Sequence, residues 1–332
     1  MRVWWRRNAW GSVITLTLSL GGGVAACAAS SHSLRVVAAP VADLRAQPGG
    51  PPPTSTTHDP LQETQLLYGE CVKLLNTDGA WAFIEAIEQP EYTHHHRWEG
   101  YPGWIRSDLL QPLQSPFHPN AIIATKWATV WQEAQGTTPQ LQLPIGTKVR
   151  VTNTTGELWP LQSITAAPAW ISRRDVRLIR ALKRLPGSSR RSAILRAAET
   201  FLGDPYFWGG RSPFAGPTSR EVTGVDCSGL VNLAYRSVGL DIPRDAHEQY
   251  LRAHKIARPK LADLVFLSAP DNPAKIVHVM LYAGEGWLIE GPGTGLFVHR
   301  IQVAERLGRP IEQLTSGERI DRQTLFFGAY LP

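Results

Sequence analysis

The chain has 332 residues, of which 43% are hydrophobic and 19% are charged, so it is long enough for two or three globular domains. Half of its formal net charge of +6 comes from three arginines in residues 1–27, and this mild basicity does not indicate nucleic-acid binding. The three cysteines form no C-x-x-C pair and no Cys/His spacing typical of a metal site.

Residues 1–27 have the pattern of a bacterial export signal. A basic start precedes an apolar run from Gly11 to Ala26, which is too short to span a bilayer comfortably. The run ends in VAAC, which resembles a lipobox in which Cys27 would be diacylated and become the mature N-terminus. A plain signal peptide with a nearby cysteine is the alternative. We expect an exported, lipid-anchored protein of the cell envelope (periplasm or outer surface), with residues 28–34 as a linker.

Two similar blocks of short strand patterns follow, at residues 35–113 and 119–178. YGECVKLL matches PIGTKVRV, AWAFIEA matches LWPLQSI, and GWIRSDLL matches AWISRRDV, in the same order in both blocks. Such a repeat predicts two copies of one small all-β module. The strand pattern resembles the bacterial SH3-like barrels that accompany cell-wall hydrolases.

A basic linker helix is predicted at residues 179–193, where Leu182 and Leu185 share one face and the arginines and lysine point elsewhere. The residues from Pro186 to Ser189 are expected to break it before a second helix begins. A solvated helix between domains is the favoured interpretation, and a membrane-surface role is the alternative.

The stretch VDCSGLVNLAYRSVGL predicts a helix from Ser228 to Val238, so that Cys227 lies at its N-terminus. Free backbone N–H groups and the helix dipole at that end favour a thiolate, which is the form that a nucleophilic cysteine needs. Gly229 permits a close approach of the backbone. Cys227 is therefore the candidate nucleophile, and a packed, disulfide-bonded or metal-binding cysteine is the alternative.

A base for this nucleophile is sought in the apolar strand IVHVMLYAG, where His278 is the polar exception. The letters YAGEGW predict a hairpin that pairs Tyr282 with Gly286 and thereby places His278 opposite Glu290. Opposed residues share a face of the sheet with Cβ atoms about 5 Å apart. Nδ1–H of His278 would then donate to Glu290. His299 is the alternative orienting residue.

Four stretches in this order, DPYFWGGRSP, VDCSGLVNLAYRSVGLDIPRDAHEQ, LADLVFL and VHVMLYAGEGWLIEG, closely resemble the NlpC-like cysteine endopeptidases that cut peptidoglycan stem peptides. The resemblance covers residues 194–332 and implies an α+β papain-like catalytic domain, here preceded by two small all-β SH3-like barrels. It implies Cys227 as nucleophile, His278 as base and a polar residue 12 positions later as orienter. That residue is Glu290, whereas the family usually has His; a carboxylate would also stabilise the imidazolium.

The resemblance also implies substrate-binding residues near the nucleophile. Asp226 would pair with the free α-ammonium of an N-terminal L-Ala, and Ser228 would supply a further hydrogen bond. Tyr206 would line the cleft near the developing oxyanion, with the backbone N–H of Cys227 as the other donor. For Asp226, a simple helix N-cap is the alternative.

The first β module resembles that of endopeptidases that recycle murein peptides, in which a Glu and a Tyr of the first barrel meet the amino terminus of the substrate. The matching positions are Glu70 and Tyr101. The alternative is that Glu70 is a surface turn residue and Tyr101 a core aromatic. A cleft capped in this way would admit only stem peptides already freed of sugar.

The predicted function is hydrolysis of the amide between γ-D-Glu and the following diamino acid in stem peptides with a free N-terminal L-Ala. No metal or organic cofactor is expected, because three consecutive histidines (His94–His96) cannot share one strand face and fit a solvated loop better. The expected partners are stem peptides and, through the lipid anchor, a membrane, but no nucleic acid. The alternatives are a hydrolase of intact cross-linked peptidoglycan with wall-binding barrels and a catalytically silent wall-binding protein.

Overall fold

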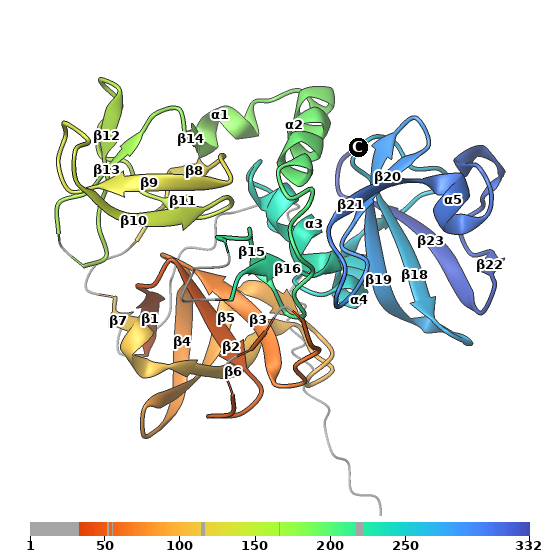
Figure 1. The fold of residues 1–332 in the computed structure, drawn as a ribbon, viewed down its shortest axis with the longest axis horizontal. Helices are drawn as coiled ribbons and strands as arrows, with labels where there is room; N and C mark the ends of the chain where they lie inside the picture. The colour runs from red at the N-terminus through yellow and green to blue at the C-terminus, as the bar shows by residue number, and fades with distance from the viewer. Residues whose placement is uncertain (1–32, 52, 55, 114–116, 166, 217–221) are drawn as a thin grey trace, which may run out of the picture.

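The computed structural model describes residues 33–332 except 52, 55, 114–116, 166 and 217–221. The expected export signal and its lipidation residue, Cys27, lie outside the described residues. Within the described ranges, no helix is long and apolar enough to cross a membrane. Figure 1 shows two β-rich units beside a unit that combines helices with a sheet.

The first β unit is an antiparallel sheet with the strand order β3-β2-β6-β5-β4-β1-β7 over the part of residues 34–112 that is described. Burial alternates along β5 because successive side chains point to opposite faces, which places Ala82, Ile84 and Ala86 in the core. The unit consists of β1 (Leu34–Val37), β2 (Val41–Arg45), β3 (Gln62–Leu67), β4 (Cys71–Asp78), β5 (Trp81–Glu91), β6 (Glu99–Arg106), the 3-10 helix η1 (Ser107–Leu109) and β7 (Leu110–Pro112).

The second β unit has two antiparallel sheets, with the strand orders β10-β9-β13-β12 and β11-β8-β14 over its described residues. Its core includes Ile123, Val130 and Ile171. Both units are compatible with small SH3-like modules in strand content and position. The strands are β8 (Ala121–Ile123), β9 (Trp127–Trp131), β10 (Pro139–Pro144), β11 (Lys148–Val149), β12 (Leu158–Pro160), β13 (Trp170–Ser172) and β14 (Val176–Leu178).

The linker forms two helices, α1 (Ile179–Lys183) and α2 (Gly187–Glu199), on either side of a break, as the sequence predicted. The predicted break from Pro186 to Ser189 was too long, because α2 begins at Gly187 directly after Pro186. Proline is tolerated at the start of a helix, where its missing N–H group has no intrahelical acceptor. Leu182 of α1 packs with Ile122 of the second β unit.

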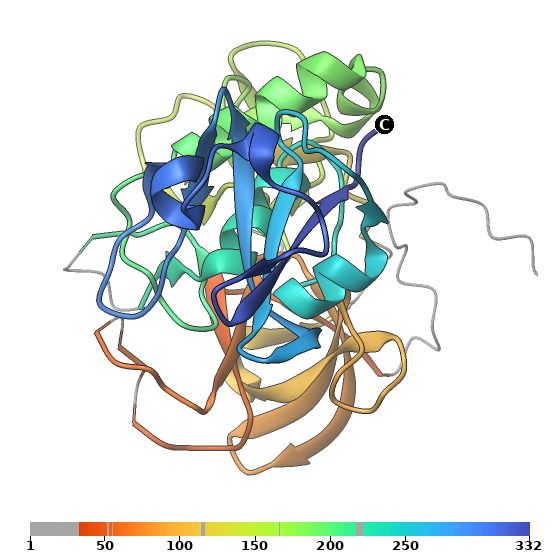
Figure 2. The ribbon, with the colours of Figure 1, turned by 90° about the vertical axis from the view of Figure 1, so that its right-hand side faces the viewer.

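The third unit is an antiparallel sheet with the strand path β17-β23-β18-β19-β20-β21 in the described chain. Helices α2 and α3 contribute to one core with Val279 of β19, and α5 contributes to a second core with Met280 of the same strand. Figure 2 shows α4 and α5 beside these strands. The remaining elements are β15 (Arg211–Ser212), β16 (Gly224–Val225), α3 (Cys227–Arg236), α4 (Ala246–Arg252), β17 (His254–Lys255), β18 (Leu264–Ala269), β19 (Asn272–Gly284), β20 (Trp287–Glu290), β21 (His299–Gln302), α5 (Val303–Leu307), η2 (Ile311–Gln313), β22 (Arg319–Ile320) and β23 (Gln323–Ala329).

A buried ion cluster joins the three units. Glu88 of the first unit accepts from Lys148 of the second at 3.0 Å and from Arg236 of the third at 2.8 Å. Asp241 also pairs with Lys148 and with Arg236, at 2.8 Å in both cases. Burial alone would raise the pKa of Glu88, but Lys148 and Arg236 lower it to about 2. The units are therefore fixed to one another by charges that lie largely out of water.

Candidate active site

Cys227 is the first residue of α3, as the helical pattern predicted. Asp226 caps this helix, because its Oδ1 accepts from the backbone N–H of Gly229 at 2.6 Å. A Cβ at position 229 would lie 2.1 Å from the carbonyl oxygen of Gly210, so only glycine permits this close approach. Among the described cysteines Cys227 carries a free thiol, and it is 7% exposed. The thiol thus lies at the positive end of a helix, where a thiolate is stabilised.

His278 of β19 and Glu290 of β20 lie side by side, with 2.6 Å between Nε2 of the imidazole and Oε2 of the carboxylate. The sequence analysis expected Nδ1 of His278 to face the carboxylate, but in the structure Nε2 does so. Nδ1 is therefore the ring nitrogen available to Cys227. Hydrogen bonding and charge from Cys227 raise the pKa of His278. The structure brings the three predicted residues together, although they lie far apart in the sequence.

The predicted hairpin register was wrong by two positions. Leu281 pairs with Ile289 and Tyr282 with Leu288, because the turn is shorter than expected and the ladder is irregular between Tyr282 and Gly284. The shift by two leaves every side chain on the same face of the sheet, since the side-chain period of a strand is two. His278 and Glu290 therefore meet diagonally instead of directly opposite each other.

The charges in this group favour an imidazolium. Burial lowers the pKa of His278, but hydrogen bonding and charge interactions with Cys227 and Glu290 outweigh burial and raise this pKa to about 9. Burial raises the pKa of Glu290, but hydrogen bonding to His278 and the charges of His278 and Arg306 lower it below its usual value. The arrangement therefore holds a protonated imidazole next to the sulfur of Cys227.

Arg306 of α5 is a site residue that the sequence analysis missed. Its Nε donates to Oε1 of Glu290 at 2.8 Å, so each oxygen of this carboxylate faces a different cationic group. His299, the alternative orienter, pairs with Glu290 across β20 and β21 and has its Nε2 3.5 Å from the same Oε1. His299 thus lies on the side of Glu290 away from the oxygen that faces His278. Nothing local to the sequence around Arg306 indicated this contact.

Asp226 and Ser228 belong to an internal network around Arg244, another residue that the sequence analysis missed. The guanidinium of Arg244, which is fully buried, donates to both oxygens of Asp226 at 3.1 and 2.8 Å and to Oγ of Ser228 at 2.9 Å. Gly209 N–H also donates to Asp226, at 3.1 Å. The carboxylate predicted to bind a substrate ammonium is therefore occupied by a helix cap and an arginine.

Tyr206 is buried beside the nucleophile. Its backbone forms a bridge with Val225, two residues before Cys227. Burial raises the pKa of Tyr206 above its usual range, and the neighbouring Cys227 and Asp226 raise it further. The phenol therefore keeps its proton and remains a hydrogen-bond donor, as a group near a developing oxyanion requires.

Glu70 does not occupy the predicted position at the cleft. It is 2% exposed, and its Oε1 lies 2.8 Å from Arg211 and 3.1 Å from Arg236. Arg236 is the last residue of α3, at the opposite end of this helix from Cys227. Glu70 belongs to the buried ion cluster between the units and has no free charge to offer a substrate.

Tyr101 is 3% exposed, and its hydroxyl has partners other than Glu70. Its hydroxyl oxygen is 3.1 Å from Oε2 of Glu63 in β3 and 3.0 Å from Oδ2 of Asp245, the residue before α4. A hydroxyl donates one hydrogen, so it serves one of these carboxylates at a time. Asp245 lies in the same region as Cys227, because the charges of both residues raise the pKa of Tyr206. We call Glu63, Tyr101 and Asp245 the acidic pocket.

The electrostatics of the acidic pocket differ from those of an ordinary surface. Burial raises the pKa of Asp245 to about 7. The positive charge of Arg244 lowers this pKa, and the nearby carboxylates of Glu248 and Asp226 raise it. Burial also raises the pKa of Tyr101 well above its usual value. The sequence contained a signal for Asp245 in PRDAHEQ, but Glu63 could be found only from the packing of the first β unit on α4.

Comparisons with known proteins identify the unit that carries Cys227, His278 and Glu290. Residues 203–308 match the model of the NlpC/P60 family. The chain is 25% identical over 236 residues to a gamma-D-glutamyl-L-lysine dipeptidyl-peptidase of Bacillus cereus, covering 69% of this chain and 67% of the relative. It is also 25% identical over 254 residues to the Bacillus subtilis protein of the same name, covering 75% and 78%. The peptidoglycan endopeptidase RipB of Mycobacterium tuberculosis is 38% identical over 120 residues, which are 33% of this chain and 48% of RipB.

The fold agrees with these sequence comparisons. The crystal structure of an NlpC/P60 family protein from Bacillus cereus superimposes with a TM-score of 0.70 at 21% identity, covering 90% of this chain and all of that one. The shared fold thus includes the β-rich units as well as the unit that holds Cys227. Residues 203–308, which include Cys227, His278 and Glu290, form an NlpC/P60 domain, the domain of a family of cysteine peptidases.

Proposed function

We propose that this protein hydrolyses the amide between γ-D-Glu and the following diamino acid in peptidoglycan stem peptides that begin with a free L-Ala. The observation that carries the proposal is the acidic pocket next to the nucleophile, where the hydroxyl of Tyr101 lies 3.1 Å from Glu63 and 3.0 Å from Asp245. Two similar relatives that cover most of the chain are named gamma-D-glutamyl-L-lysine dipeptidyl-peptidases.

The acidic pocket suits a primary ammonium. An ammonium group has three N–H donors and one positive charge, which match a hydroxyl oxygen flanked by two carboxylates. The side chains of Glu63 and Asp245 are 22% and 38% exposed, so solvent and a ligand can reach them. A peptide whose amino terminus is linked to a sugar through an amide lacks this charge. The pocket therefore favours released stem peptides over intact wall.

The proposed chemistry uses the residues gathered at the start of α3. The thiolate of Cys227 attacks the amide carbonyl, and the developing oxyanion accepts hydrogen bonds from the Cys227 backbone N–H and from Tyr206. His278, as the imidazolium, donates its proton to the leaving amine, and the C–N bond breaks to leave a thioester. Water, deprotonated by His278, then attacks the thioester and releases the dipeptide acid and the free thiol. Glu290 orients His278 throughout and stabilises its cationic form.

The two β-rich units and the N-terminus have roles in this proposal. We take the β units as SH3-like modules, the first of which closes one end of the cleft through Glu63 and Tyr101. We take residues 1–27 as an export signal with Cys27 as a lipidation site, which would keep the enzyme in the envelope where stem peptides are released. Metabolic labelling with a palmitate analogue, with Cys27→Ala as the control, tests the anchor separately.

Mass spectrometry of reaction products tests the proposed substrate. The purified protein is given L-Ala-γ-D-Glu-diaminopimelate and, separately, the same peptide carrying N-acetylmuramic acid, with Cys227→Ala as the control. We expect release of L-Ala-γ-D-Glu from the free peptide alone. Cleavage of both at similar rates would overturn the requirement for a free amino terminus and favour the hydrolase of intact wall. Cleavage of neither would overturn the substrate class.

A further inference from the structure

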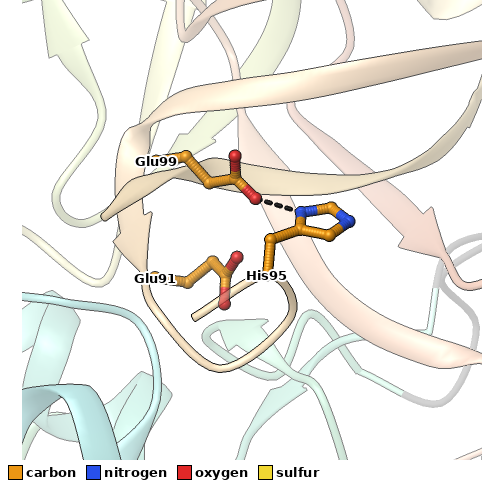
Figure 3. Close-up of side chains that lie close together, drawn as sticks. All are labelled: Glu91, His95 and Glu99. Atoms are coloured by element: carbon orange, nitrogen blue, oxygen red, sulfur yellow. Dashed lines mark hydrogen bonds and ion pairs between the residues drawn. The ribbon is translucent and has the colours of Figure 1, made fainter. Parts of the chain in front are cut away.

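The hairpin between β5 and β6 carries a second cluster of chemically competent side chains, apart from the active site. Glu91 ends β5, His95 lies in the connecting loop and Glu99 begins β6. Each offers one ligand atom, and these atoms all lie within 4.8 Å of one another. Figure 3 shows the imidazole of His95 beside Glu99 and the carboxylate of Glu91 below them.

Glu91 is the residue of this cluster whose carboxylate is only partly paired. It is 1% exposed, and its Oε2 accepts from the backbone N–H of His94 at 3.1 Å and lies 3.0 Å from Nδ1 of the His94 ring. Its Oε1 is buried and has no hydrogen-bond partner among the described residues. A buried carboxylate oxygen without a donor or cation is costly, because it has lost its water. A positive ion bound at Oε1 would remove this cost.

The other two residues already contact each other. Oε2 of Glu99 accepts from Nε of Arg97 at 2.7 Å, and Oε1 of Glu99 pairs with Nδ1 of His95. The side chain of Glu99 is 11% exposed, whereas that of His95 is 55% exposed, so the His95 ring can turn to admit an ion between itself and Glu99.

The ligand types define the class of metal. One imidazole and two carboxylates suit zinc and similar divalent transition metals, whereas Mg²⁺ and Ca²⁺ prefer oxygen ligands alone. Ligand atoms at about 2.0–2.1 Å from a metal in a tetrahedron lie roughly 3.4 Å apart. Nδ1 of His95 and Oε1 of Glu99 must therefore move apart, and ligand atoms as far as 4.8 Å from one another must move closer. We propose that Glu91, His95 and Glu99 bind a divalent metal ion of the zinc class, with water in the fourth position.

The position of this site assigns it a structural role. Thr93, in the same loop, donates its backbone N–H to Glu248 of α4 at 3.1 Å. The guanidinium of Arg252 lies 3.8 Å from the ring centre of Trp98, at the other end of the loop. The metal would therefore fix the loop between β5 and β6, which contacts α4. The acidic pocket depends on the same packing of the first β unit against α4.

The test is a zinc titration of untagged Cys227→Ala protein, because the thiol, imidazole and carboxylate of the active site are themselves zinc ligands. Competition with a chromophoric chelator measures the affinity. We expect one equivalent of Zn²⁺ at this site. His95→Asn should weaken the zinc affinity of this site by about 100-fold or more, because even the loss of a group that only hydrogen-bonds to a metal ligand lowers metal affinity by about 10–100-fold. His96→Asn is the matched control, since His96 is a neighbour outside the cluster whose φ of 53° asparagine tolerates.

Two further readouts separate the proposal from unfolding and from other ligand sets. Glu99→Gln should lose the affinity while keeping the wild-type circular dichroism spectrum, and X-ray absorption of the bound zinc should show one imidazole among oxygen ligands. Bound zinc should also raise Tm, and this rise should be absent in His95→Asn. Equal zinc affinity in His95→Asn and His96→Asn would overturn the proposal, as would a spectrum with two or more imidazoles. No zinc binding at 100 µM metal (about the weakest useful affinity) would also overturn it.

Discussion

The two ends of the cleft are built in different ways. Cys227, His278 and Glu290 all belong to the sheet and helices of the NlpC/P60 domain. The acidic pocket takes Glu63 and Tyr101 from the first β unit and Asp245 from the start of α4. The comparison teaches that the proposed catalytic residues come from one domain, whereas the proposed site for the substrate ammonium depends on how that domain packs against the first β unit.

The charges at the two ends differ as well. At the catalytic end, Glu290 is neutralised by His278 at 2.6 Å and by Arg306 at 2.8 Å. At the other end, Arg244 pairs with Asp226 at 2.8 Å and lies 3.4 Å from Asp245, and Nε2 of His94 lies 3.7 Å from Glu63. The carboxylates beside Tyr101 are therefore only partly neutralised, whereas Glu290 has a cationic group close to each of its oxygens.

The largest effect should come from removing the nucleophile. Cys227→Ala leaves no atom to form the thioester, and we expect kcat/KM to fall by at least about 10⁴-fold, as in other enzymes that lose a nucleophile. Steady-state kinetics on the free tripeptide measure this loss. The variant should still bind the peptide in isothermal titration calorimetry, because the acidic pocket is intact. More than about 1% residual activity would contradict the role of Cys227.

The second largest effect should come from Glu290→Gln. The amide can still orient His278 but no longer stabilises the imidazolium, so we expect kcat to fall by about 100-fold. In the wild type, activity needs the imidazolium and is lost as pH rises through the His278 pKa of about 9. Loss of the carboxylate lowers this pKa, so the alkaline limb of the pH–rate profile should move to lower pH.

His299→Ala is the control for Glu290→Gln. Nε2 of His299 lies 3.5 Å from the Glu290 oxygen that does not face His278, so kcat and the alkaline limb should stay close to those of the wild type. An unchanged alkaline limb in Glu290→Gln would instead show that the carboxylate does not set the His278 pKa. A shift in His299→Ala as large as that in Glu290→Gln would assign the orienting role to His299.

A smaller effect, confined to binding, should follow from changes in the acidic pocket. Asp245→Asn removes one of two carboxylates that face the ammonium, and we expect KM to rise by about tenfold with kcat changed by less than about threefold. In the wild type, KM should also rise as pH falls below about 7, because Asp245 then becomes protonated. This acid-side rise should be absent from Asp245→Asn. A fall in kcat with unchanged KM would contradict a role in ammonium binding.

The smallest effect on activity should come from Glu70→Gln, which instead affects stability. Arg211 and Arg236 would keep their buried charges and lose a carboxylate 2.8 and 3.1 Å away, so the free energy of unfolding should fall by about 3–5 kcal/mol. Urea unfolding measures this loss. Glu157→Gln, which breaks the exposed pair with Arg173, should leave the midpoint unchanged. A raised KM in folded Glu70→Gln would restore Glu70 to the substrate site.

Much of the catalytic end was predictable because its signals are local. The helix start at Cys227 followed from the pattern after it, and a two-residue error in the hairpin register still left Glu290 on the face of His278 because strand side chains have a period of two. The choice of Nε2 over Nδ1 at Glu290 was not predictable. It depends on the ring orientation, which the surrounding packing decides.

Pattern matching failed where the partners come from another unit. Glu70 occurs in a repeated strand motif, but burial against Arg211 and Arg236 gives it a structural role. The histidine run was set aside because three adjacent histidines cannot share a face, yet His95 alone meets glutamates four residues before and after it in a hairpin.

The sequence by itself determined that Cys227 begins a helix and that His278 and Glu290 lie on neighbouring strands, because periodicity and helix capping act within a few residues. Only the tertiary structure decided how strongly each carboxylate is paired. Arg244 donates to Asp226 at 2.8 Å, whereas its contact with Asp245 is 3.4 Å and Asp245 also faces Tyr101. The free energy of a buried charge depends on every group within a few ångströms, and those groups come from segments that the sequence places far apart.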